Sequence, residues 1–159
     1  ASLMRSRLRS LEPRVTASTH WLTEEQARRA AELAGNPLRS SVVQAHAAAD
    51  AAGKLIGTAY FDARTVRSHP QTLMTVINPD GSLQRVEVLS FDEPLEYLPK
   101  ARWFGEFRGR KLDAELQLKR GVHAVTGATL TSRATVAAVR EALAVHQVLQ
   151  AAQPPAPQP

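Results

Sequence analysis

Four hydroxyl side chains and one glycine fall within seven residues, TGATLTS at 126–132, directly before an alanine-rich segment with helical spacing. Hydroxyl residues of this kind cap helices, and the first turn of a helix offers unpaired N–H groups and a positive dipole end that bind anions. Gly127 also lets the backbone approach a bulky anion closely. The residues alone leave two interpretations open: an ordinary capped helix or a phosphate-binding site.

Several other kinds of chemistry find no support in the sequence. No lysine follows the glycine as a Walker A loop requires, and the segment does not fit G-x-G-x-x-G. The chain has no cysteine, which excludes disulfides, thiolate metal ligands and thiol nucleophiles. Its 5 histidines lack the spacings that are typical of metal sites. No sequence pattern holds two carboxylates at the fixed distance that catalysis by a carboxylate pair requires. We therefore predict no metal site and no catalytic residue.

The charge pattern limits the classes of partner. The net charge is +5, and much of the excess lies in arginines near the N-terminus. A basic arm can approach phosphate or an anionic membrane surface, although a solvated leader is the simpler interpretation. The body lacks the basic face and stacking platform of nucleic-acid-binding modules, so we expect no nucleic-acid partner. The sequence contains no apolar run of about 18 residues, so it predicts no transmembrane segment.

Local signals predict the first helix and a hairpin. Thr23 and Gln26 form a capping box, and Gly35 supplies a stop, so a short helix is expected between them. The turn sequence NPDG at 78–81 predicts a β-hairpin over 71–91. Alternating or β-branched residues predict four strands in all. Their sequences are SSVVQAHAA, KLIGTAYFD, QTLMTVI and LQRVEVLSF.

The last part of the chain is expected to end in a long helix. A helical turn is predicted near 99–107, and a helix capped by Thr131 or Ser132 is predicted to end near Leu149. These elements predict an α+β fold: a single domain with a mainly antiparallel sheet, on which an N-terminal helix and a C-terminal helix pack.

We expect this domain at 20–150. A flexible basic leader is predicted at 1–19 and a disordered proline-rich tail at 151–159.

The TGATLTS segment resembles the S/T-G-A-T-x-T-S signature of the FMN-binding domain family. This family includes the covalently flavinylated subunits of the sodium-translocating NADH:quinone oxidoreductase and of the Rnf complexes. Three more segments are similar to family elements in the same order, namely GKLIGTAYF, INPDGSLQRVEVLSFDEP and ARWFGEFRGRKL. The resemblance covers roughly 40–149.

The resemblance implies that Thr129 carries FMN, through an ester between its side-chain oxygen and the FMN phosphate. A separate flavin transferase, which uses FAD and a divalent cation, would perform the attachment. The other motif residues in the predicted cofactor site are Thr126, Gly127, Ala128, Leu130, Thr131 and Ser132. One position departs from the family pattern: His123 stands where the better-known members have an acidic residue.

Glu93, Tyr97 and Trp103 complete the predicted cofactor site, together with His123. Glu93 matches the glutamate–proline loop of the family and is a candidate acceptor for the flavin or its ribityl chain. Tyr97 and Trp103 are candidates to stack on the flavin ring. An ordinary surface or core role is the alternative for each of the three.

The predicted function is that of an extracytoplasmic flavoprotein, in the periplasm or on the outer face of the cytoplasmic membrane. It would carry FMN for electron transfer to or from a membrane redox system. The expected partners are a flavin transferase and a membrane redox partner, and association with the membrane is also expected. A module that binds FMN or another phosphate ligand reversibly, or a sensory module, is the alternative, and His123 motivates it. An enzyme that uses bound flavin on a small substrate is a third hypothesis, which no acid–base constellation supports.

Overall fold

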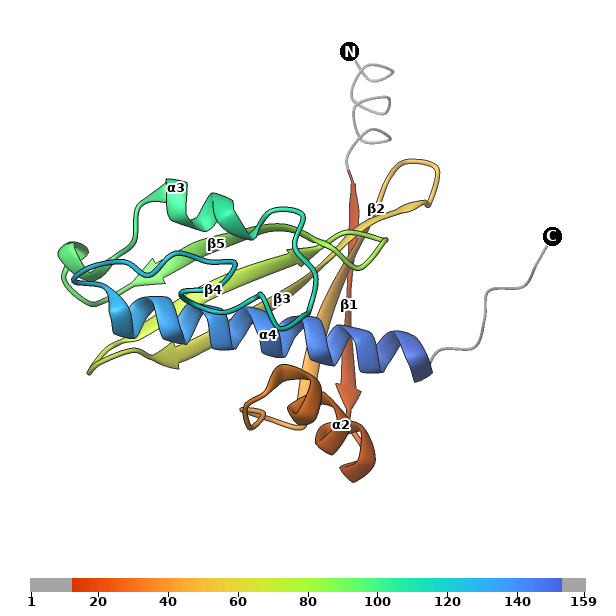
Figure 1. Cartoon of the computed structure of the whole chain (residues 1–159). Coiled ribbons are helices and arrows are strands. Elements are labelled where there is room, and N and C mark those ends of the chain that lie inside the picture. The colour runs from red at the N-terminus through yellow and green to blue at the C-terminus, as the bar shows by residue number, and fades with distance from the viewer. Residues whose placement is uncertain (1–12, 153–159) are drawn as a thin grey trace, which may run out of the picture.

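Five antiparallel strands form one sheet in the order β1-β2-β3-β4-β5, and the long helix α4 lies across one face of it (Figure 1). The computed structural model describes residues 13–152. The strands are β1 (Arg14–Trp21), β2 (Val42–Ala49), β3 (Leu55–Thr65), β4 (Pro70–Ile77) and β5 (Leu83–Phe91). The helices are α2 (Glu24–Ala34), α3 (Ala101–Phe104) and α4 (Thr129–Ala152), with 3-10 turns η1 (Leu95–Tyr97) and η2 (Gly105–Phe107). The predicted α+β class with an antiparallel sheet is confirmed.

Strand β1 corrects the predicted leader, because residues 14–19 belong to the sheet. β1 pairs with β2 along its whole length. All its side chains are exposed except the half-buried His20, so burial imposes no alternation by which sequence periodicity could reveal the strand. Residues 1–12 and 153–159, the rest of the expected leader and most of the expected tail, lie outside the described residues.

The four predicted strands are present, and β4 and β5 form the predicted hairpin. In its turn, the amide of Asn78 donates to the carbonyl of Ser82 at 2.8 Å, and the amide of Gly81 donates to the carbonyl of Asn78 at 2.9 Å. Gly81 has a φ of +88°, which glycine adopts without strain. The turn sequence therefore determines the register of this hairpin.

Helix α2 begins and ends where the sequence predicts. The Thr23 side chain accepts a hydrogen bond from the Gln26 amide, and the Gln26 side chain accepts one from the Thr23 amide. Gly35 ends the helix in the left-handed conformation, with a φ of 78°. The buried Ala30 and Ala34 are small, which allows close packing. That packing is chiefly against α4, whereas the sequence analysis places α2 on the sheet.

Helix α4 contributes much of the hydrophobic core. Its Val139 and Leu143 are buried in the same cluster as Ile77 of the sheet. The hydroxyl of Tyr60 is hydrogen-bonded to Nδ1 of His146 at 2.8 Å, which joins β3 to the C-terminal half of the helix. Burial raises the pKa of Tyr60 and lowers the pKa of His146, so both groups are neutral at neutral pH.

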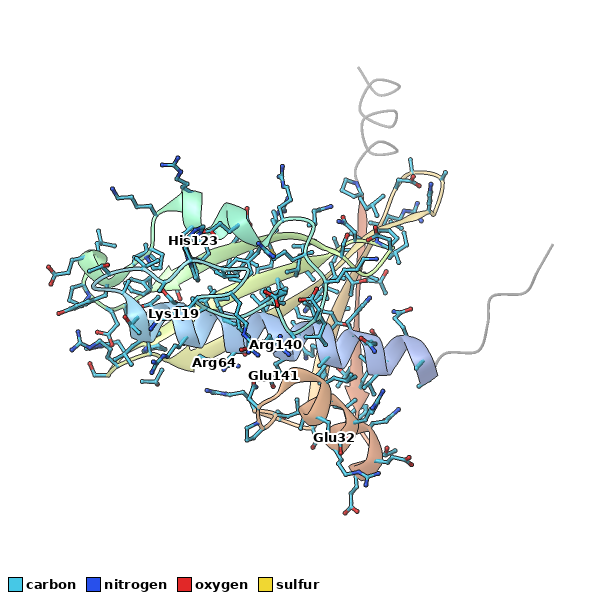
Figure 2. All side chains as sticks on the ribbon, in the orientation of Figure 1. Glu32, Arg64, Lys119, His123, Arg140 and Glu141 are labelled. Atoms are coloured by element: carbon cyan, nitrogen blue, oxygen red, sulfur yellow. The ribbon has the colours of Figure 1, made fainter. Side chains whose placement is uncertain are left out.

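Arg140 ties α4 to two other segments (Figure 2). Its guanidinium donates to the carbonyls of Ala34 and Leu33, at the end of α2, at 2.7 and 3.3 Å. It also donates to the carbonyls of Asp113 and Leu116, in the loop before α4, at 2.7 and 3.1 Å. The last carbonyls of a helix lack partners within the helix, so a cation at this position satisfies them and complements the helix dipole.

Glu93 holds the turn between β3 and β4. Its Oε1 accepts hydrogen bonds from the amides of Ser68, His69 and Arg67 at 2.7, 2.9 and 3.2 Å. These amides, that of Ser68 foremost, lower the pKa of Glu93 to about 2. Its carboxylate is therefore a structural anchor that fixes the end of β3 against the end of β5.

We expect Arg140→Ala to lower the free energy of unfolding by about 2 kcal/mol, because the end of α2 and the loop before α4 lose a shared charged donor. Urea denaturation followed by circular dichroism measures the change. Arg133→Ala is the matched control: Arg133 is an exposed arginine of the same helix, and its loss should cost less than about 0.5 kcal/mol. Equal losses in the two variants would contradict the role given to Arg140.

Glu93 should contribute stability that depends on pH. Its pKa is lower in the folded chain than its ordinary value of 4.5, so the contribution is present above that value and is lost as the pH falls towards about 2. Glu93→Gln should therefore be less stable than the wild type at neutral pH, and the difference should shrink over that acid range. Denaturation curves at several pH values test this. A difference that stays constant down to the acid end would show that the charge of Glu93 is not what stabilises the turn.

Candidate functional site

The TGATLTS segment forms the junction between a loop and the N-terminus of α4. Gly127 has a φ of +82° and turns the chain into the helix. The amide of Ser132 donates to the carbonyl of Ala128 at 2.9 Å, so the helical hydrogen bonds begin there. The helix starts at Thr129, earlier than predicted. Thr131 and Ser132 consequently lie inside the first turn, and neither caps the helix.

The hydroxyl groups in the second half of the motif are buried and face the protein. The hydroxyl of Ser132 donates to the Ala128 carbonyl at 2.7 Å. One turn later, the hydroxyl of Thr135 donates to the Thr131 carbonyl at 2.8 Å and accepts a hydrogen bond from Nε2 of Gln71 at 3.2 Å. Thr131 and Ser132 are 1% and 0% exposed, so their side chains anchor the helix and cannot reach a ligand on the surface.

The first half of the motif faces solvent. Thr126, Gly127 and Thr129 are exposed, whereas Ala128 is buried. Leu130 is 48% exposed, and its amide belongs to the first turn, whose N–H groups have no acceptor within the helix. The hydroxyl of Thr129 is therefore accessible at the positive end of a 24-residue helix.

Trp103 is buried and holds the loop before the motif by a hydrogen bond. Its indole N–H donates to the carbonyl of His123 at 2.7 Å. Its ring packs edge to face against Phe107 and Phe104, with centroids 5.1 and 5.0 Å apart. With 5% exposure, Trp103 has almost no face free for another ring. The structure thus gives it the core role and not the predicted stacking role.

His123 extends into solvent beside a carboxylate that the sequence analysis does not single out. Its Nδ1 is paired with Oε1 of Glu106, from η2, at 2.5 Å, and the His123 amide donates to the same oxygen at 3.3 Å. The side chain of His123 is 89% exposed. A negative charge therefore lies next to the position where the family pattern has an acidic residue, although it comes from another segment.

Glu93 and Tyr97 lie around the β3–β4 turn. Oε1 of Glu93 is occupied by three backbone amides, which leaves Oε2 near the ring of His69 at 3.5 Å. Tyr97 is half-buried, and the guanidinium of Arg67 lies 4.4 Å from its ring centroid. Both side chains already have partners within the protein, so their predicted contacts with flavin stay a prediction.

A groove of about 450 Å³ opens at Thr129 and runs along α4 towards the end of α2. We call it the Thr129 groove. Its lining includes Thr129, Arg133 and Arg140 on α4, Lys119 and Ala124 on the preceding loop, and Gly35 after α2. Of the predicted cofactor-binding residues, only Thr129 lines it.

The cations of this groove are not among the residues predicted from the sequence. Arg133 follows Thr129 by four residues, a spacing that places two side chains on one helix face, so a signal for it was present. Lys119 and Glu106 have no comparable signal in the sequence. They lie in segments outside α4, and tertiary contacts bring these segments close to the motif.

Comparison with known proteins finds similarity to an FMN-binding family in the second half of the chain. Residues 68–144 match the sequence profile of the FMN-binding domain family. The solved structure of NqrC from Shewanella oneidensis is similar, with a TM-score of 0.51 and 18% sequence identity, over 85% of this chain and 70% of that one. At this identity the likeness shows a common fold. No curated protein sequence matches the chain significantly.

The matched region contains the whole TGATLTS motif, and within it the hydroxyl of Thr129 is exposed and lines a groove. Residues 68–144 are therefore similar to the FMN-binding domain family, and FMN is the cofactor that this match indicates.

Proposed function

We propose that this protein carries FMN, esterified through its phosphate to Thr129, and exchanges electrons with a membrane redox system. The observation that carries the proposal is the placement of Thr129: it is the exposed first residue of α4, lies inside the family motif and lines a groove of about 450 Å³. Small-molecule sites commonly measure roughly 300–1,000 Å³. The groove therefore has the size of a small-molecule site and can receive a group attached at Thr129.

Formation of the ester requires an external catalyst and an activated donor, because a threonine hydroxyl is a weak nucleophile. The Thr129 oxygen would bond to the phosphorus of the FMN half of FAD. The pyrophosphate bond of FAD would break, AMP would leave, and the hydroxyl proton would pass to the flavin transferase. The exposed Thr129 offers such an enzyme direct access, which the buried Thr131 and Ser132 do not.

The chain binds and orients the cofactor, and FMN supplies the electron-transfer chemistry when it is bound. The phosphodiester keeps one negative charge, which the amides of the first turn and the dipole of α4 stabilise. An extracytoplasmic location, in the periplasm or on the outer face of the membrane, is part of this proposal and follows from the family resemblance.

Within residues 13–152, no helix combines the length and hydropathy that crossing a bilayer requires.

Reversible binding of FMN is the second candidate function. It is motivated by His123, which stands at the usual acidic position. A flavin transferase that requires a carboxylate at this position would find an imidazole there and would not attach FMN. The carboxylate of Glu106, paired with His123, favours the covalent function, since it restores a negative charge at this place.

Intact mass spectrometry of protein produced together with a flavin transferase should show a gain of one FMN less one water. The gain should be lost in Thr129→Ala, because the ester oxygen is removed, and kept in Thr129→Ser. Thr126→Ala, which removes the other exposed hydroxyl of the motif, is the matched control for position, with peptide mapping to locate the flavin.

Three results would contradict the covalent proposal. Flavin on Thr126 with none on Thr129 would reassign the anchor. Yellow protein that loses its colour on denaturation, without a mass gain, would establish reversible binding instead. Colourless protein without a mass gain would refute flavin binding by this chain.

A further inference from the structure

Two cations line the Thr129 groove from its two walls, Arg133 from α4 and Lys119 from the preceding loop. No aspartate or glutamate lines the groove. Among residues 13–152, no carboxylate lies within salt-bridge distance of either cation. The groove therefore has an uncompensated positive charge next to the one exposed hydroxyl that the family motif brings to it.

Arg133 lies within reach of a group attached to Thr129. Residues four apart on a helix occupy the same face, with Cβ atoms about 5–6 Å apart. Both side chains line the groove, so they project from α4 in the same direction. Side chains on a helix lean towards its N-terminus, so the side chain of Arg133 can reach back over Thr129. Its guanidinium can there donate two hydrogen bonds to a phosphate on the Thr129 oxygen.

Lys119 lies on the loop before α4 (Figure 2) and is held in an unusual backbone conformation. Its φ is 66°, and no other residue with a side chain has a positive φ within the described part of the chain. Its amide donates to the carbonyl of Val122 at 2.8 Å, which fixes the turn. Glycine would adopt this conformation without strain, so the chain keeps the lysine side chain here at a conformational cost.

Arg140, the third cation of the groove, is not available to a ligand in the same way. Its guanidinium already donates to four backbone carbonyls, and burial lowers its pKa. The free positive charge therefore lies at the Thr129 end of the groove and not along its whole length.

We infer that Arg133 and Lys119 bind the phosphate group of the flavin in the Thr129 groove. This inference rests on the proposed function, because it takes FMN to be the ligand. It adds the residues that select a phosphorylated flavin over an unphosphorylated one, and it places the phosphate on the groove side of α4.

The test compares the binding of FMN and riboflavin to the unflavinylated protein by fluorescence titration. Arg133→Gln and Lys119→Gln should each weaken FMN binding about tenfold, the loss expected for one charge-assisted hydrogen bond at an accessible site. Riboflavin, which lacks the phosphate, should bind equally to all variants, and inorganic phosphate should compete only with FMN. Lys119→Gly removes the charge, and glycine adopts the positive φ without strain, so this variant should fold. Weaker FMN binding by Lys119→Gly would therefore come from the lost charge and not from misfolding.

Arg102→Gln and Lys54→Gln are the matched controls, since both remove an exposed cation outside the groove. The inference is overturned if the controls weaken FMN binding as much as the groove variants. It is also overturned if the groove variants bind FMN as the wild type does, or if millimolar FMN does not bind to the wild type.

The two proposals can fail separately. A mass gain on Thr129 with no effect of Arg133→Gln on FMN binding would refute the groove inference and leave the covalent function intact. FMN binding that depends on Arg133 and Lys119, without any mass gain on Thr129, would refute the covalent function alone.

Discussion

The position of α4 along the sheet is the constraint on which the site depends. A helix turns by about 100° per residue, so a slip of one residue would carry Thr129 away from its groove. Two sets of hydrogen bonds prevent this slip. Arg140 holds the middle of α4 to the end of α2 and to the preceding loop, and Thr135 holds the second turn to Gln71 of β4. Burial of the apolar face of α4 also stabilises its packing.

The motif divides its residues between the fold and the surface. Ala128, Thr131 and Ser132 are buried and fix the beginning of the helix, while Thr126 and Thr129 are exposed. A single short segment can therefore present an exposed hydroxyl and anchor the helix that carries it. The buried Thr131 and Ser132 belong to the first turn of the helix, although neither caps it. The exposed residues stay the predicted phosphate site.

Much of the fold follows from local signals in the sequence. The capping box of Thr23, the stop at Gly35 and the turn at 78–81 act through neighbouring residues, and the structure confirms all three. Strand β1 escapes prediction because neither of its faces is buried. The start of α4 is predicted too late because hydroxyl residues usually act as caps, whereas Ser132 and Thr135 here bond back to carbonyls one turn earlier inside the helix.

The candidate site was only partly predictable, since its walls come from segments distant in sequence. Thr129 follows from the motif, but Lys119 and Glu106 reach it through tertiary packing, and Trp103 supports it from the core. Glu93 has a role that its sequence position does not indicate: its carboxylate satisfies the amides of a turn, while its predicted contact with flavin stays a prediction.

The chemical state of the flavin phosphate distinguishes a covalent carrier from a reversible binder most directly. A phosphate monoester changes its charge near pH 6, whereas a phosphodiester keeps one charge throughout. We expect the ³¹P NMR resonance of the flavin-loaded protein to stay constant from about pH 5 to about pH 8 and to couple to the β-proton of Thr129. A resonance that moves through a transition near pH 6, without that coupling, would show that no ester exists and contradict the account.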